Sequence, residues 1–147
     1  MFNKILVAFD IAHEEQVPHL LKAAFEILDQ SGGEICLFYA DPNVLQGIST
    51  QQLDKQNIRH HKQEVKLAME SLMISIKETC SKDEFEVIDC QTEQGSAHER
   101  ILKQAKKIKA DAIILMSKKP GFSSYFIGSN ADKVVRHAKC SVFVIRP

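Results

Sequence analysis

Short, almost wholly apolar runs alternate with longer amphipathic segments along the whole chain, and this alternation limits the possible folds more than any other feature. The apolar runs cover residues 5–9, 35–40, 112–116 and 142–145, and a run of mixed character covers 84–90. Short apolar runs of this kind are typical of strands that are covered on both faces of a parallel sheet. Parallel neighbours need a long crossover, usually a helix, and such crossovers are right-handed. The sequence therefore predicts an α/β protein with five strands and four helices in one doubly wound parallel sheet.

Four segments between these runs have the spacing of amphipathic helices. One covers residues 19–28, with Pro18 in its first turn, where a missing N–H costs little. A long one covers 55–80, and its predicted buried side carries Val65, Leu67, Ala68, Met69, Leu72, Met73 and Ile76. A third begins at Ser96, which forms a capping-box pattern with Glu99. The fourth covers 131–138, and residues 43–54 are predicted to form a loop.

Length and composition fit one ordinary globular domain over residues 1–147. The chain is 44% hydrophobic and 26% charged, which is the usual balance of such domains. A membrane-spanning helix would need roughly 18 consecutive apolar residues, and no run approaches that length. The first apolar run is also too short for a secretory signal peptide. We therefore expect a cytoplasmic protein that does not span a membrane.

The four cysteines and six histidines show no metal-binding spacing, since the sequence has no CxxC or HxxxH pair. Cys36, Cys90 and Cys140 lie in or beside apolar runs, which favours buried thiols. The pair His60-His61 lies on a polar helix and is predicted to be solvated. His98 and His137 also lie in predicted helices, where surface or packing roles are favoured over catalysis. No metal site is expected.

The formal net charge is zero, but the charge is unevenly distributed. Residues 1–100 carry 9 Lys and Arg against 17 Asp and Glu, whereas residues 101–147 carry 10 against 2. A basic C-terminal third favours an anionic ligand such as a nucleotide phosphate, although the two parts could equally neutralise each other across the fold. Aromatic residues are not interleaved with Lys and Arg as they are in proteins that bind single strands, so nucleic acid is not the expected partner.

Any ligand is expected at the carboxyl edge of the predicted sheet. In doubly wound sheets ligands bind beyond the carboxyl ends of the strands, at the topological switch point. This places Asp10, Ala40 and the segment from Met116 onward at one rim. Asp10 could accept hydrogen bonds from a base or a ribose, or it could cap the following turn, which is the commoner role of such aspartates.

The sequence Gly128-Ser129-Asn130 directly precedes the last predicted helix. The free N–H groups and positive end of a helix suit a phosphate, and a glycine lets the backbone approach it closely. Lys118 and Lys119, just upstream, favour an anion. A simpler reading, favoured by residue type alone, is that Ser129 or Asn130 caps the helix without any ligand.

The motifs of several enzyme classes are missing from the sequence. It has no GxxxxGK[ST] loop, no GxGxxG after the first strand and no GxSxG elbow. Phosphoryl transfer needs a carboxylate that can hold Mg²⁺ beside the phosphates. Only Asp10 and Asp41 reach the predicted rim, so this chemistry has little support.

Several of these segments resemble the universal stress protein family, and the resemblance extends over essentially the whole chain. It rests on residues 5–10, 95–96, 110–114 and, most specifically, 128–146. The stretch 117–120, followed by Ser123-Ser124-Tyr125, is most similar to the bacterial F/G-type branch. The resemblance implies a Rossmann-like, adenine nucleotide α-hydrolase-like three-layer sandwich with strand order 3-2-1-4-5. It also implies a homodimer through the last strand, whose unpaired edge suits such pairing.

The resemblance also implies a nucleotide site. Many members of the family bind ATP through a G-x2-G-x9-G[ST] motif after the fourth strand. Only its last element is intact here, as Gly128-Ser129, whereas Met116 and Lys119 occupy the two earlier glycine positions and the spacing is one residue shorter. The resemblance makes Asp10 the aspartate beside the adenine and Ala40 the residue whose backbone meets the base. The F/G-type branch is still associated with nucleotide binding.

The sequence thus predicts a homodimeric stress-response sensor or regulator that binds ATP or another adenine nucleotide, with or without Mg²⁺, and lacks efficient catalysis. The expected site residues are Asp10, Ala40, Met116, Ser117, Lys118, Lys119, Gly128, Ser129 and Asn130. Two alternatives stay open. One is a dimer that binds protein partners after losing its nucleotide site, which the replaced glycines would explain. The other is a slow ATPase or phosphotransferase.

Overall fold

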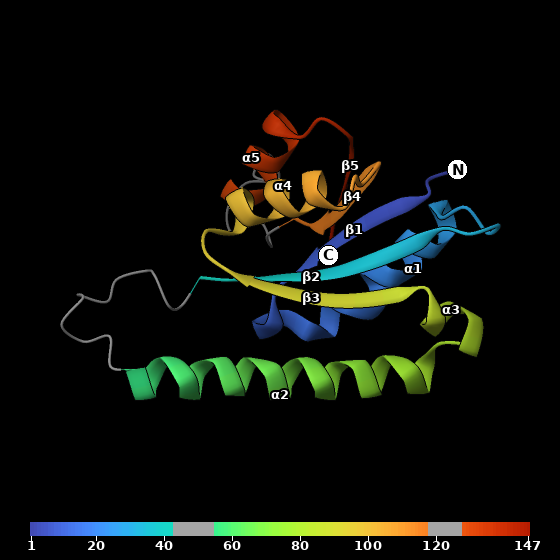
Figure 1. The fold of residues 1–147 in the computed structure, drawn as a ribbon. Helices are drawn as coiled ribbons and strands as arrows, with labels where there is room; N and C mark the ends of the chain where they lie inside the picture. Colours follow the sequence, from blue (N-terminus) through green and yellow to red (C-terminus); the bar gives the residue numbers. More distant parts are fainter. Residues whose placement is uncertain (43–54, 118–127) are drawn as a thin grey trace.

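The computed structural model describes residues 1–42, 55–117 and 128–147, and in this part of the chain five strands form one sheet with the order β3-β2-β1-β4-β5 (Figure 1). All four pairings are parallel. The strands are β1 (Lys4–Phe9), β2 (Glu34–Asp41), β3 (Ile88–Gln94), β4 (Ala112–Met116) and β5 (Ser141–Ile145). The predicted fold class and strand order are confirmed.

Helices cover both faces of the sheet, α1 and α2 on one face and α4 and α5 on the other (Figure 1). In chain order they are the 3-10 helix η1 (Ile11–Gln16), α1 (Val17–Ile27), α2 (Lys55–Thr79), α3 (Lys82–Glu86), α4 (Ala97–Lys107) and α5 (Ser129–His137). Two helical elements, η1 and α3, were not predicted. No helix within the described residues has the length and apolar character that crossing a membrane requires.

The central strand β1 supplies side chains to two separate hydrophobic cores. Ile5, Val7 and Phe9 pack in the core beneath α1 and α2, whereas Leu6 and Ala8 pack in the core beneath α4 and α5. This division follows from the two-residue period of a strand. All five side chains are buried, which is why the sequence reads as a continuous apolar run rather than as an alternating one.

One side of α2 faces the sheet, and its buried residues follow helical spacing: Val65, Met69, Leu72 and Ile76. The prediction was wrong for Leu67, which is 58% exposed. Leu67 lies two positions after Val65, or about 200° around the helix axis, and therefore points away from the sheet. Its apolar character does not change this, because position on the helix decides which face a side chain occupies.

The strand predicted at 84–90 is wrong in its first half, because α3 occupies residues 82–86 and β3 begins only at Ile88. The Ser81 hydroxyl accepts a hydrogen bond from the Glu84 N–H at 3.2 Å, and the Glu84 carboxylate accepts one from the Ser81 N–H at 3.1 Å. This is a complete capping box. The box fixes a helical start and overrides the strand-like alternation of Phe85 and Val87.

A second local prediction is wrong, because the capping box expected at the start of α4 does not form. Ser96 is the N-cap residue, but its side chain makes no capping bond to the helix backbone. Instead, the Ser96 hydroxyl lies 3.0 Å from His98 Nδ1. The Ser96 hydroxyl therefore contacts the His98 imidazole instead of the backbone N–H group that the capping-box pattern predicts.

The two faces of α2 yield a matched test of the fold. We expect Leu72→Ala, at a position only 6% exposed, to lower the free energy of unfolding by about 2–5 kcal/mol through lost burial and a residual cavity. The same substitution at Leu67 should change it by less than about 0.5 kcal/mol. Urea unfolding monitored by circular dichroism measures both values, and equal losses at the two positions would contradict the orientation of α2.

Candidate functional site at the carboxyl edge of the sheet

The strands β1, β2 and β4 end side by side at one edge of the sheet. Phe9 of β1 is opposite Tyr39 of β2, and Val7 is opposite Ile114 of β4. The chain leaves β1 for β2 on one side and returns to β4 on the other, so the topological switch point lies between β1 and β4. The predicted residues Asp10, Ala40 and Met116 all stand at this edge.

Asp10 directly follows β1 and is exposed. Its Oδ1 accepts a hydrogen bond from the Ala12 N–H at 3.0 Å, and it is the N-cap residue of η1. Of the two roles left open for Asp10, the structure therefore shows the turn-capping one. Because the side chain is exposed at the rim, the same carboxylate can also meet a ligand there.

Ala40 lies near the end of β2, and its small side chain is buried in the core beneath α4 and α5. Its neighbour Tyr39 points to the opposite core. Burial raises the pKa of Tyr39 to about 12, and the carboxylates of Asp41 and Asp10 contribute to the same increase. The Tyr39 hydroxyl is therefore protonated at neutral pH.

Met116 and Ser117, at the end of β4, point in opposite directions. The Met116 side chain packs against the core beneath α1 and α2. The Ser117 N–H donates to the Ile145 carbonyl at 2.8 Å, which extends the β4–β5 ladder by one residue and, by strand alternation, turns the hydroxyl toward the side of α5. Ser117 is only 2% exposed. Among the described residues, its hydroxyl has no hydrogen-bond partner.

Gly128 is the N-cap residue of α5, with φ at 95° and ψ at 147°, a conformation that is essentially restricted to glycine. No side chain caps the helix, so the expectation that Ser129 or Asn130 would be the cap is wrong. Both lie inside the first turn and are exposed. Because α5 follows β4 in a parallel sheet, its uncapped N-terminus faces the carboxyl edge.

Two other predicted site residues, Lys118 and Lys119, lie outside the described residues, as does the loop predicted at 43–54. The structure therefore brings Asp10, Ala40, Met116 and Ser117 to one edge of the sheet and places the start of α5 at the same edge.

The sequence interpretation missed a short contact between His61 and the buried Asp41 carboxylate beside this edge. His61 Nε2 of α2 lies 2.6 Å from Asp41 Oδ2 at the end of β2, and Asp41 is only 2% exposed. The Asp41 carbonyl also accepts a hydrogen bond from the Gly95 N–H at 2.9 Å. Helical spacing could have revealed the contact, because His61 lies four positions before the buried Val65. His60, by contrast, is exposed as predicted and pairs with Glu64 on the same helix.

The cysteines offer no reactive centre. Cys36 and Cys90 lie on adjacent strands but point to opposite faces of the sheet. Burial raises the pKa of the Cys90 thiol to about 12, and the charges of Cys36 and Asp89 act in the same direction. A thiol in this state is a poor nucleophile at neutral pH. In the described part of the chain, no three His, Cys, Asp or Glu side chains are grouped closely enough to hold a metal ion.

Comparisons with known sequences all lead to one family. The model of the universal stress protein family matches residues 1–146. The chain is 26% identical to Universal stress protein G of Salmonella typhimurium over 148 residues, which cover 99% of this chain and 100% of that protein. It is 23% identical to Universal stress protein Sll1388 of Synechocystis, with 99% of this chain and 98% of that protein covered.

Solved structures agree on the fold. Universal stress protein UspA from Lactobacillus plantarum is similar with a TM-score of 0.66 at 20% identity, covering 98% of this chain and 97% of that one. A universal stress protein family protein from Arabidopsis thaliana with AMP bound has a TM-score of 0.59 at 18% identity, with coverages of 98% and 91%. A universal stress protein in complex with cAMP reaches 0.66 at 14% identity, with coverages of 99% and 97%.

Adjacent histidines on α2 provide a test of the Asp41–His61 contact. We expect His61→Ala to lower the free energy of unfolding by about 1–3 kcal/mol, because it removes a short polar partner from a buried carboxylate. His60→Ala should cost less than about 0.5 kcal/mol, since its pair is exposed. Urea unfolding at pH 7 measures both changes. In a double-mutant cycle with Asp41→Asn, additive losses would contradict the contact.

Proposed function

The chain belongs to the universal stress protein family, and from this premise we propose that it is a stress-response sensor or regulator that binds ATP or another adenine nucleotide at the carboxyl edge of β1 and β4. In this proposal the protein is a cytoplasmic homodimer, residues 1–147 form one domain, and binding rather than efficient catalysis is the function. The observation that carries the proposal is the Ser117 hydroxyl, which is buried and has no hydrogen-bond partner among residues 1–42, 55–117 and 128–147.

A buried hydroxyl without a partner is costly. Leaving such a group unsatisfied costs about 1–3 kcal/mol, and most buried polar groups in folded proteins are paired. Ser117 lies at the topological switch point and faces the side of α5, where ligands of this sheet type bind. A ribose or phosphate oxygen of a nucleotide would supply the missing partner.

The start of α5 supports a phosphate beside Ser117. A helix N-terminus leaves backbone N–H groups unpaired and carries the positive end of the helix dipole, so an anion is stabilised there. The glycine at position 128 adds no side chain in front of these groups, and no side chain of the described residues caps them. The pattern Gly128-Ser129 is also the intact part of the family's nucleotide motif.

The remaining residues have proposed roles around the base and the phosphates. Asp10 and the backbone of Ala40 would meet the adenine and ribose at the end of β1 and β2. Met116 is compatible with a nucleotide because its side chain packs into the α1–α2 core rather than toward α5. Lys118 and Lys119 would add positive charge to the phosphate loop. The relatives solved with AMP and with cAMP support an adenine nucleotide as the ligand class.

The proposal of weak or absent catalysis is supported by the small number of carboxylates that the described residues bring to the rim. Asp41 is buried and held by His61 at 2.6 Å, so Asp10 is the nearby acid that remains exposed. One carboxylate gives Mg²⁺ few protein ligands, and the ion would enter mainly as the counter-ion of a bound triphosphate. A slow ATPase is accordingly the least favoured alternative.

Dimerisation through β5 is the second part of the proposal. β5 lies at the edge of the sheet, and its apolar side chains are only partly buried, namely Val142, Phe143, Val144 and Ile145. An apolar edge strand invites pairing with another strand. The same feature is compatible with the alternative of a dimer that acts only through protein partners. A measurement of nucleotide binding distinguishes the two functions, because only the first requires it.

Substituting Ser117 should move stability and affinity in opposite directions. We expect Ser117→Ala to leave the free energy of unfolding of the nucleotide-free protein unchanged or to raise it by up to about 1 kcal/mol, because an unsatisfied hydroxyl is removed. The affinity for ATP should fall by about 3- to 10-fold, which corresponds to one lost hydrogen bond. Calorimetric titration and urea unfolding measure the two effects, with Ser75→Ala on the exposed side of α2 as control.

A second variant tests the same site at a different position, in case other contacts of the nucleotide compensate for the loss of the Ser117 hydroxyl. Gly128→Asp brings a carboxylate to the start of α5 and should abolish ATP binding, although the positive φ of this position adds some strain to the folded state. If both folded variants bind ATP as tightly as the unsubstituted protein, the site assignment is wrong.

A further inference from the structure

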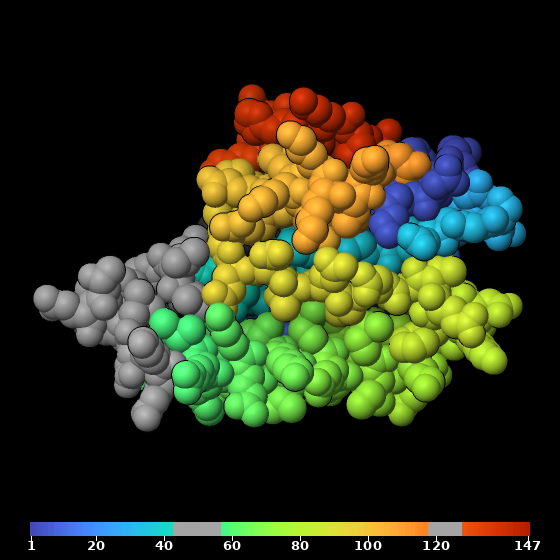
Figure 2. All heavy atoms as spheres, in the orientation of Figure 1, coloured from blue at the N-terminus to red at the C-terminus, as the bar shows by residue number. Residues whose placement is uncertain are grey.

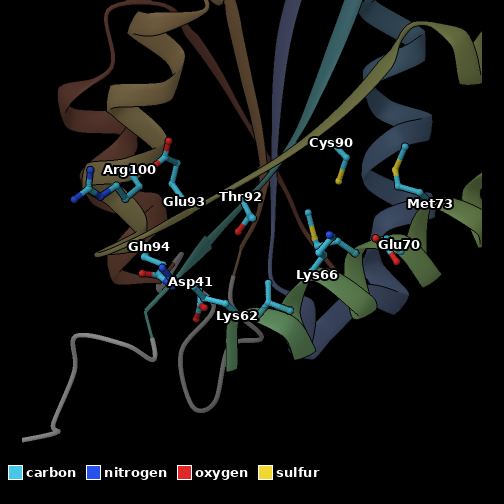
Figure 3. A pocket seen from close by; sticks show the side chains of 12 residues that line it. Asp41, Lys62, Lys66, Glu70, Met73, Cys90, Thr92, Glu93, Gln94 and Arg100 are labelled. Carbon is cyan, nitrogen blue, oxygen red and sulfur yellow. The ribbon is translucent and has the colours of Figure 1, made fainter. Parts of the chain in front are cut away.

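A second site candidate is a cleft of about 820 Å³ between α2 and the edge strand β3 (Figure 3). Cavities that hold small ligands usually measure about 300–1,000 Å³. Among the strands of the described residues, β3 pairs only with β2, and its other edge faces none of them. Figure 2 shows this face of the molecule, where the surface of β3 borders that of α2. The cleft lies two strands away from β1 and so does not coincide with the switch point.

The floor of the cleft is apolar and deformable. It is formed by Val65, Met69 and Met73 of α2 and by Cys90 of β3. Val65 and Met69 are each 8% exposed, while Met73 and Cys90 are partly buried. Methionine side chains are flexible and polarizable and can adapt to ligands of different shape. The floor therefore suits the apolar body of a small molecule.

Two cations stand at one end of this floor. Lys62 and Lys66 line the cleft one helical turn apart on the same face of α2 (Figure 3). Neither lysine forms a salt bridge with a described residue. Like charges at this spacing repel each other, and Glu70, at the same spacing beyond Lys66, offsets only part of this repulsion. An anionic group between them would relieve the repulsion. This arrangement provides an anchor for the head of an amphipathic ligand.

The other charged residues of the cleft disfavour a ligand that carries several negative charges. Glu70 lies one turn beyond Lys66, Glu93 lies on β3, and Asp41 closes the cleft at the end of β2. Asp41 is held by His61, and Arg100 of α4 contributes one further cation. These carboxylates would repel a polyphosphate more strongly than they would repel a single carboxylate group.

We propose that the cleft between α2 and β3 binds a small amphipathic monocarboxylate, with its carboxylate between Lys62 and Lys66 and its apolar body on the methionine floor. This ligand class differs from the adenine nucleotide assigned to the carboxyl edge at β1 and β4. Because β2 separates β3 from β1, we expect the two sites to be occupied independently.

Displacement of the fluorescent dye 1-anilinonaphthalene-8-sulfonate from nucleotide-free protein tests the proposal. We expect decanoate to displace the dye, hexanoate to do so much more weakly because each buried CH₂ contributes about 0.8 kcal/mol, and decylamine to fail despite its equal chain length. Failure of decanoate at millimolar concentration, or equal displacement by decylamine, would overturn the proposal.

Matched variants locate the anchor. Lys62→Gln combined with Lys66→Gln should weaken decanoate binding by about tenfold, as expected for loss of a charge-assisted bond. Lys103→Gln combined with Lys106→Gln removes the same charge from the exposed face of α4 and should change the affinity by less than about twofold. Equal effects of the two double variants would contradict the anchor.

The proposed function is tested separately by repeating the displacement with saturating ATP and with Gly128→Asp. We expect the dye and decanoate affinities to be unchanged in both cases. Displacement of the dye by ATP itself would overturn the assignment of the cleft to a monocarboxylate. If ATP does not bind but dye binding is unchanged, the proposed nucleotide site is wrong and the proposal for the cleft stands.

Discussion

Burial of β1 on both faces, together with its pairing on both edges, determines most of what this molecule can do. Its side chains enter two cores in strict alternation, so both helical layers are fixed relative to this strand. Its neighbours β2 and β4 lie on opposite sides of it. The chain must therefore reverse its direction of progress at β1, and the point of reversal lies at the edge where the three strands end.

The polar groups at that edge are a direct consequence of where the apolar runs stop. Asp10, Asp41 and Ser117 are the first polar residues after the apolar stretches of β1, β2 and β4. The three side chains differ in their hydrogen-bond partners. Asp10 caps η1, Asp41 pairs with His61, and the Ser117 hydroxyl is buried without a partner within the described residues. The Ser117 hydroxyl is therefore the group of the three at which we propose that a ligand binds.

Long apolar runs and regular helical spacing were sufficient to predict the fold class, because burial on both faces leaves a signal in composition alone. The local hydrogen bonds at helix starts were not predictable in the same way. Ser81 forms a capping box although the alternation around Phe85 is typical of a strand, and the Ser96 hydroxyl contacts an imidazole rather than the helix backbone. The candidate site was predicted as a set of positions, but the exposure and partners of each side chain depend on the packed structure. That Ser117 would be buried and Met116 turned away from α5 follows from ladder geometry, which the sequence does not contain.

A nuclear magnetic resonance titration of ¹⁵N-labelled, nucleotide-free protein with ATP tests the central claim most directly. The account predicts saturable changes in the amide shifts of Ser117, Gly128 and Ser129, smaller changes at Asp10 and Ala40, and none at the methionine-lined cleft between α2 and β3. Absence of any saturable change, or changes confined to α2 and β3, would contradict it.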